Sequence, residues 1–116
     1  MAFQQYNFNN HTTGDTFNGV QFEVLVNAVA LDLTGSTIVM KLRQNNNVNV
    51  YYELSTTGGQ LTLSAPLLGK FQVNQQIINF APAKYNYSIE LHLASGNTYT
   101  YIQGSWTIIA QAINNG

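Results

Sequence analysis

The chain has 116 residues, no cysteine, 8% charged residues and a formal net charge of -1. This length fits one compact domain, and the lack of cysteine excludes a disulfide scaffold, a thiolate metal site and a cysteine nucleophile. An ordinary soluble domain carries about 25% charged residues, so neutral side chains, 15 Asn, 10 Gln, 11 Thr and 6 Ser, must form most of this polar surface. Such a surface favours association, whereas four Lys and Arg residues are too few for a face that binds nucleic acid.

The N-terminal part of the chain is expected to be loosely held. It has no basic region followed by an apolar run, so we expect no signal peptide. The most apolar stretch, residues 20–33, is interrupted by Gln, Glu, Asn and Asp, and we expect no membrane span. We predict a flexible arm over residues 1–13, rich in Gln and Asn, and a single β-sandwich domain over residues 14–113.

The first half of the domain carries strand patterns. Residues 16–26 and 28–33 are predicted as early strands, followed by a turn at Thr34-Gly35-Ser36. Residues 37–44 alternate, with Ile38, Met40 and Leu42 on one face, which is typical of a half-buried strand. After the Asn tract at 45–47, residues 48–54 restore the alternation and are predicted to complete a hairpin.

The second half continues in the same way. Residues 60–63, 70–73 and 77–80 are predicted as short strands, and residues 65–69 as one helical turn. Strict alternation over residues 85–93, a turn at 94–97 and β-favouring residues at 98–102 predict a hairpin. Gly104 is expected to mark a bulge or bend before a last strand at 106–110. The whole pattern predicts an all-β fold of two antiparallel sheets, with about seven to nine strands and minimal helix.

Residues for catalysis or metal binding are scarce. The acidic residues, candidates for the paired carboxylates of a glycosidase, are Asp15, Glu23, Asp32, Glu53 and Glu90. Asp15 and Asp32 lie in turn contexts, where an Asx side chain bonds its own backbone. His11 and His92 have no third ligand at metal spacing. We therefore expect no enzyme activity, no metal and no cofactor.

Binding chemistry is better supplied, because seven Tyr, six Phe and one Trp accompany the amides. Alternation assigns Tyr85, Tyr87 and Trp106 to the core. The orientation of Tyr99 and Tyr101 stays open: they form an outward stripe if Thr98 and Thr100 point inward. The candidate partner-binding residues are Phe3, Tyr6, Phe8, Tyr51, Tyr99 and Tyr101.

The N-terminal arm is a further candidate contact. Phe3, Tyr6 and Phe8 have no obvious core register. An arm of this kind can add a strand to the sheet of a neighbouring molecule.

Three motifs together resemble a phage family. They are Asp32-Leu33-Thr34-Gly35 before an alternating strand, Tyr85-Asn86-Tyr87-Ser88-Ile89-Glu90-Leu91, and Gly104-Ser105-Trp106-Thr107-Ile108. In this order they resemble the immunoglobulin-like N-terminal domain of tailed-bacteriophage baseplate upper proteins and related small virion proteins, over most of residues 14–110. The resemblance implies an immunoglobulin-like sandwich that is a structural part of a virion, in the baseplate, tail, neck or head decoration. It implies docking onto other virion proteins, often in several copies, and no active site.

Several residues of these motifs have a structural explanation of their own. Asp32 can accept backbone N–H groups across its turn, Gly35 permits positive φ, and Glu90 can pair with Lys41 or Arg43. The residues assigned to turns and strands are Asp15, Asp32, Gly35, Glu90 and Gly104. The alternatives to a virion module are a carbohydrate-binding sandwich for a host-surface glycan, with exposed coplanar aromatic rings, and an enzyme with converging carboxylates.

Overall fold

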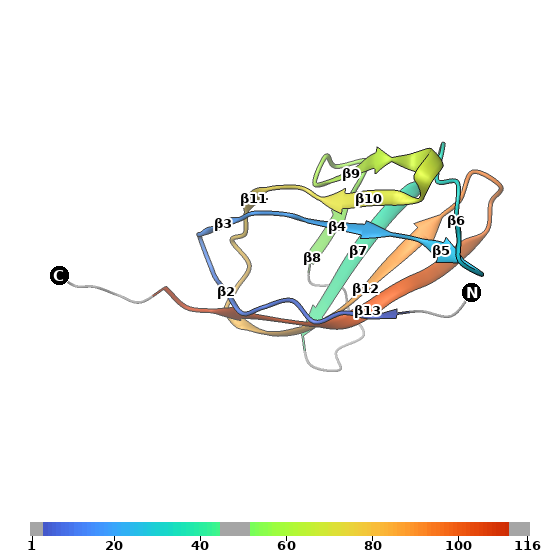
Figure 1. Ribbon diagram of the computed structural model, residues 1–116. Coiled ribbons are helices and arrows are strands. Elements are labelled where there is room, and N and C mark those ends of the chain that lie inside the picture. The colour runs from blue at the N-terminus through green and yellow to red at the C-terminus, as the bar shows by residue number, and fades with distance from the viewer. Residues whose placement is uncertain (1–3, 45–51, 112–116) are drawn as a thin grey trace.

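The computed structural model describes residues 4–44 and 52–111, which form two facing layers of strands (Figure 1). A 3-10 turn, η1 (Pro66–Leu68), is the helical turn expected at residues 65–69. The strands of the described part are β1 (Gln4–Gln5), β2 (His11–Thr12), β3 (Thr16–Phe17), β4 (Val20–Glu23), β5 (Leu25–Val26), β6 (Val29–Ala30), β7 (Thr37–Gln44), β8 (Tyr52–Ser55), β9 (Leu61–Ala65), β10 (Lys70–Val73), β11 (Gln76–Ile77), β12 (Ala83–His92) and β13 (Thr98–Ile109).

The larger sheet has the order β1–β13–β12–β7–β8. β12 and β13 form the long hairpin that the sequence predicts, and β7 pairs with the other side of β12. On β7 the predicted inward residues Ile38, Met40 and Leu42 are all fully buried. The alternation of apolar and polar residues therefore places one face of this sheet on the core and leaves the other face polar.

The second layer is shorter and more broken. β4, β10 and β9 form a three-stranded antiparallel sheet. β3 and β11 form a separate antiparallel pair, and β5 and β6 form a short antiparallel hairpin. The strand predicted over residues 16–26 is thus interrupted, and the strand predicted over 77–80 is confined to Gln76–Ile77.

The strand order is that of an immunoglobulin-like sandwich. In that fold one sheet holds strands B, E and D and the other holds G, F and C, to which variable-type domains add C′. Here β3–β4, β10 and β9 take the places of B, E and D, and β13, β12, β7 and β8 take those of G, F, C and C′. The Tyr85 hydroxyl, near the start of β12, donates to the Ala81 carbonyl at 2.6 Å, which is the tyrosine corner of such domains. The predicted immunoglobulin-like β-sandwich is confirmed.

The N-terminal segment is placed differently from the free arm that the sequence predicts. β1 and β2 both pair in parallel with β13. Between them the amides of Tyr6 and Phe8 donate to the carbonyls of Gln103 and Ser105, each at 3.0 Å. Phe8 is only 7% exposed, and burying a phenylalanine contributes about 1.5–3 kcal/mol. Burial of Phe8 and the bonds to β13 together hold residues 4–12 at the edge of the sheet.

β13 differs from the two strands predicted on either side of Gly104. It is continuous, and the register shift lies at Tyr101, between the pairs Glu90 with Thr100 and Ile89 with Ile102. Gly104 has another role. A Cβ atom there would lie 1.8 Å from the Tyr6 carbonyl oxygen, so glycine lets the N-terminal segment lie close against β13.

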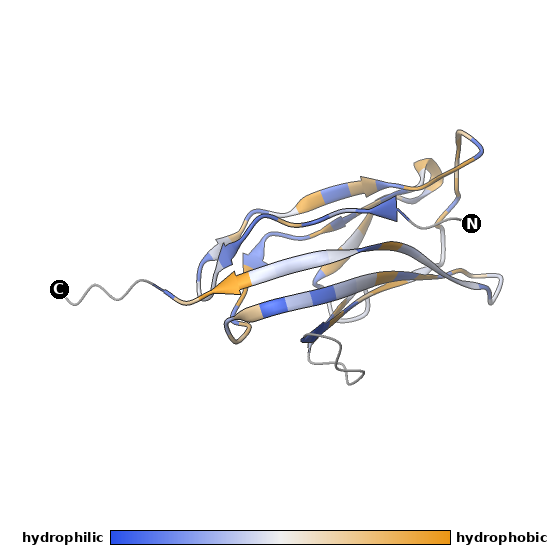
Figure 2. Ribbon diagram, turned by 90° about the horizontal axis from the view of Figure 1, so that it is seen from below, coloured by the Kyte–Doolittle hydropathy of each residue, from blue (hydrophilic) through white to orange (hydrophobic). Residues whose placement is uncertain are grey.

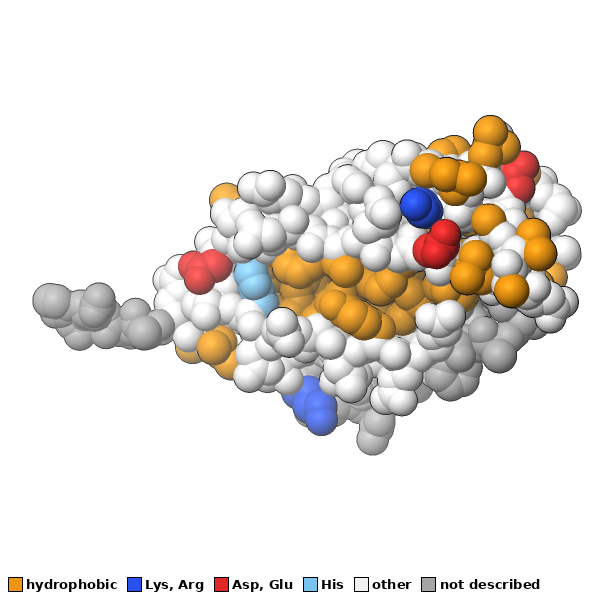
Figure 3. Space-filling view, in the orientation of Figure 1, with side chains coloured by type: hydrophobic (Ala, Val, Ile, Leu, Met, Phe, Trp, Pro, Cys, Tyr) orange, Lys and Arg blue, Asp and Glu red, His pale blue; other side chains and the backbone are white. Residues whose placement is uncertain are grey.

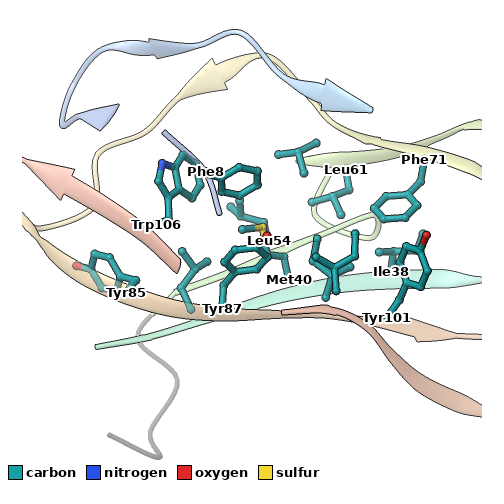
Figure 4. Close-up of a cluster of buried hydrophobic side chains, with 14 of the residues drawn as sticks. Phe8, Ile38, Met40, Leu54, Leu61, Phe71, Tyr85, Tyr87, Tyr101 and Trp106 are labelled. Carbon is teal, nitrogen blue, oxygen red and sulfur yellow. The ribbon is translucent and has the colours of Figure 1, made fainter. Parts of the chain in front are cut away.

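The core lies between the two layers and is rich in aromatic side chains (Figure 4). Trp106 and Tyr85 are fully buried and Tyr87 is 3% exposed, as alternation predicts. Phe8 stacks on Tyr87 with ring centroids 5.0 Å apart and meets Trp106 edge-on at 4.5 Å. The N-terminal segment therefore supplies one of the central side chains of the core.

Candidate interaction surfaces

Four of the six candidate partner-binding residues lie in the described part of the chain; Phe3 and Tyr51 lie outside it. Phe8 is in the core, so its assignment to partner binding is wrong: its ring packs between the layers of its own sandwich. Tyr6 is 41% exposed and covers Phe8 and Phe22, with ring centroids 5.1 Å and 5.3 Å away. Of this pair, Tyr6 alone presents a large surface to solvent.

Tyr99 and Tyr101 do not form an outward stripe. Tyr99 is paired with the buried Leu91 and is half-buried, and Tyr101 is 2% exposed. The bulge at Tyr101 turns two successive residues, Tyr101 and Ile102, toward the core. The Tyr101 hydroxyl donates to the Glu23 carbonyl of β4 at 2.6 Å and so links the two layers. The assignment of Tyr101 to partner binding is therefore wrong.

The hydroxyl groups of two buried tyrosines, Tyr87 and Tyr101, donate hydrogen bonds to backbone carbonyls of other segments. The Tyr87 hydroxyl donates to the carbonyl of Tyr6 in the N-terminal segment. Burial raises the pKa of Tyr87 well above its ordinary value, and burial raises the pKa of Tyr101 as well, with the nearby Glu23 adding to the effect. Both hydroxyls stay protonated and act as hydrogen-bond donors throughout the usual pH range.

A groove of mixed polar and apolar lining opens at one edge of the sandwich, between the N-terminal segment and β3–β4. Its volume is about 270 Å³, and it is lined by residues 6, 8–11 and 16–20. Phe8 and Phe17 lie at its base with ring centroids 5.9 Å apart, and the amides of Asn9, Asn10 and Asn18 border it. Figure 3 shows the opening as a hydrophobic strip between the edges of the two layers. We call it the edge groove.

Exposed aliphatic side chains gather at one end of the molecule, on the β5–β6 hairpin and η1. The hairpin turn is tight, with positive φ at both Asn27 and Ala28. It is held beside η1 through bonds from the Val24 amide to the Gly69 carbonyl and from the Leu33 amide to the Pro66 carbonyl. The cluster, which we call the apolar end, consists of Leu25, Val26, Val29, Leu67 and Leu68, exposed by 37–72%. Figure 2 shows the hydrophobic hairpin projecting from the body.

The outer face of the larger sheet carries a polar hollow of about 830 Å³. Its lining includes the exposed amides of Asn86 and Gln103, together with Arg43 and Lys84. Beside it the predicted pairing of Glu90 is present, because Lys41 Nζ lies 3.3 Å from Glu90 Oε1 on the neighbouring strand. This face therefore combines neutral amides with charged side chains of both signs.

The acidic turn residues behave as structural elements. Asp32 Oδ1 accepts the Thr34 amide at 2.9 Å, and Gly35 has φ of 76°. The hydrogen bonds from Thr34 hold the pKa of Asp32 below its ordinary value. Asp15 lies in the turn after β2, where its amide donates to the Thr12 carbonyl at 3.1 Å.

The described residues hold no group of three or more His, Cys, Asp or Glu side chains placed to bind a metal ion. Among residues 4–44 and 52–111 there is also no helix long and apolar enough to cross a membrane.

The residue pattern alone predicts none of the three surfaces: the edge groove, the apolar end and the polar hollow. Their residues come from segments far apart in the chain. The exposure of Leu67 and Val29 depends on how far each of the two layers extends at that end of the molecule. A partial signal was present in Leu67-Leu68 beside Pro66, an apolar pair outside any alternating pattern.

Comparisons with known proteins add little. No family model and no curated protein matches the chain. Among solved structures, CopC from Methylosinus trichosporium OB3b is 8% identical with a TM-score of 0.47, over 90% of this chain and 88% of CopC. Murine CRIg is 12% identical with a TM-score of 0.33, over 93% of this chain and 92% of CRIg. Likeness at these values carries no information about a ligand, a partner or an activity.

Proposed function

We propose that this chain is a non-catalytic structural component of a tailed-phage virion, in the baseplate, tail, neck or head decoration. It acts as a docking module that contacts neighbouring virion proteins, further copies of itself included. The virion assignment depends on the sequence motifs at residues 32–35, 85–91 and 104–108 that resemble baseplate upper proteins. In this role the protein is made in the bacterial host cytoplasm and works without a cofactor.

The observation that carries the docking role is the apolar end. Large contiguous exposed apolar patches on a soluble protein mark contact sites. Val29 and Leu67 are 66% and 72% exposed, and the tight turn at Asn27 and Ala28 presents the hairpin side chains in a fixed arrangement. A net charge of -1 gives little long-range repulsion between copies.

A direct binding experiment tests the proposal. The full chain is immobilised, and the probes are the same chain in solution and a panel of bacterial-surface glycans. The proposal predicts saturable binding of the second copy and none of the glycans. Glycan binding without binding of the second copy would contradict it.

A carbohydrate-binding sandwich is the second candidate, and the polar hollow favours it. Neutral polyols are recognised by arrays of amides and hydroxyls, which Asn86, Gln103 and their neighbours supply. The exposed coplanar aromatic rings expected for such a protein do not occur on this face among the described residues: Tyr87, the one aromatic residue that lines the hollow, is 3% exposed. Glycan binding that is lost in Asn86→Ala and Gln103→Ala would favour this candidate.

A further inference from the structure

We propose that the polar hollow on the outer face of the larger sheet binds an acidic segment of a neighbouring virion protein through Arg43 and Lys84. This contact rests on the proposed docking function and adds to it the chemistry of a partner other than a second copy. The matching segment carries two neighbouring Asp or Glu side chains, one for each cation.

Arg43 and Lys84 are neighbours on one face of the larger sheet. Arg43 faces Asn86 across the pairing of β7 with β12, and Lys84 lies two residues before Asn86 on β12. Side chains two residues apart on a strand point to the same side of the sheet. The two cations are therefore diagonal neighbours, and such residues are about 7–8 Å apart. Both side chains line the hollow.

Neither cation has a carboxylate partner within the sandwich. All five acidic side chains of the chain belong to the described residues, and none of them forms an ion pair with Arg43 or Lys84 there. Glu90 also lines the hollow, but its Oε1 lies 3.3 Å from Lys41 Nζ. The residues that face the two cations on the neighbouring strands β12 and β13 are neutral: Asn86 and Thr107.

The low charge of the chain makes this pair informative. The sequence has only four Lys and Arg residues, and two of them share one hollow without a compensating charge. Neighbouring like charges repel each other and lower stability. A bound carboxylate relieves this repulsion, and the planar guanidinium of Arg43 can hold it through two parallel N–H donors.

The size and the neutral lining of the hollow indicate a peptide segment rather than a single ion. Its volume is about 830 Å³, far more than one carboxylate group occupies. The rest of the lining includes the amides of Asn7 and Gln103 and the hydroxyl of Ser105, which can form hydrogen bonds with the backbone of a bound peptide. An uncharged glycan would leave both cations without a partner.

The composition of the chain indicates that the segment belongs to a different protein. No segment of this sequence holds two acidic residues close together, and the nearest pair is Asp15 and Glu23. A second copy therefore cannot supply two neighbouring carboxylates from one short segment. Nucleic acid is a poor fit as well, because four Lys and Arg residues are too few to follow a phosphate backbone.

A titration followed by NMR tests this contact in the full chain. The isotope-labelled protein is titrated with a tetraglutamate peptide that has blocked termini, and separately with the matched tetraglutamine peptide. We expect saturable shifts of the backbone amides of Arg43, Asn86 and Ser105 with the acidic peptide, and binding of the neutral peptide that is roughly five-fold weaker or more. Added salt should weaken the acidic peptide further, because it screens exposed charges.

Substitution of the two cations tests their role. Arg43→Gln with Lys84→Gln should weaken the acidic peptide roughly five-fold or more. Lys84→Gln alone, at an exposed position that should not disturb the fold, should weaken it in part. The matched control is Lys70→Gln, which removes a cation on β10 in the opposite layer and should leave binding unchanged. Urea unfolding checks that each variant is folded.

Three results overturn the inference: no saturable shift, equal binding of the two peptides, or equal affinity of the double variant and the Lys70→Gln control. Tighter binding of an oligogalacturonate at the same amides also overturns it, because the hollow would then belong to an acidic glycan. If the peptide fails while light scattering shows association of copies, the docking function stands and only this contact is wrong. Peptide binding by a chain that stays monomeric supports the contact and removes self-association from the proposed function.

Discussion

Gly104 and Tyr6 lie so close that a Cβ atom at residue 104 would be 1.8 Å from the Tyr6 carbonyl oxygen. The contact fixes the path of the N-terminal segment, whose Tyr6 carbonyl also accepts the Tyr87 hydroxyl and whose Phe8 fills the core. One wall of the edge groove is therefore set by a glycine on β13.

Gly104→Ala is predicted to displace residues 4–12 from β13. The new Cβ atom would meet the Tyr6 backbone, which moves less easily than a flexible side chain. Overpacking of this kind costs about 1–3 kcal/mol of the free energy of unfolding. Urea unfolding should show this loss, and proteolysis should cut the N-terminal segment faster. The control is Gly58→Ala, where the new Cβ meets only side-chain atoms of Gln60 and Ser55. Equal losses in the two variants would contradict the account.

Tyr101→Phe is predicted to lower the free energy of unfolding by about 1 kcal/mol, because the Glu23 carbonyl loses its hydrogen bond across the layers. Self-association should not change, since Tyr101 is buried. Urea unfolding and light scattering measure the two effects. Lost association at unchanged stability would return Tyr101 to the partner-binding residues.

Asp32 is predicted to give the fold a pH-dependent contribution. Its pKa is lowered in the folded state by the bonds from Thr34, so the ionised form stabilises the fold above the ordinary value of 3.8. This contribution is lost as the pH falls through the lower folded pKa. Asp32→Asn keeps an oxygen acceptor but has no charge to titrate. Urea midpoints of both proteins, followed from neutral pH to below the ordinary pKa, should converge at the acid end. Curves that stay parallel contradict the prediction.

The apolar end should be removable without harm to the fold. Val29→Ser with Leu67→Ser changes two well-exposed side chains, and such substitutions alter stability by about 0.5 kcal/mol or less. Binding of a dye that reports exposed apolar surface should fall. Ile77→Ser, which is 60% exposed on β11, is the control outside the apolar end. An equal fall in the control would show that these five residues do not act as one surface.

Local pattern predicted most of the fold, because alternation reports burial directly. It placed Ile38, Met40, Leu42, Tyr85 and Trp106 in the core. It did not predict the orientation of Tyr101. One extra residue in β13 moves the side chains of the preceding residues of this strand to the opposite face of the sheet, and no residue type marks the position of this bulge. Nor did it predict the N-terminal segment, because Phe8 is buried through pairing with β13, about a hundred residues along the chain.

The surfaces were harder to predict than the core for the same reason. The edge groove lies beside β4, which has no strand on that side among residues 4–44 and 52–111, and the apolar end is formed by η1 and the β5–β6 hairpin. Both depend on tertiary arrangement. The residue pattern indicated only that the surface would be neutral.

The molar mass of the purified full chain, measured by light scattering over a wide range of concentration, shows whether the chain associates with copies of itself. We expect a mass that rises above the 12.8 kDa of a single chain to a defined multiple. A mass that stays at 12.8 kDa at every concentration would contradict the claim that this protein associates with copies of itself.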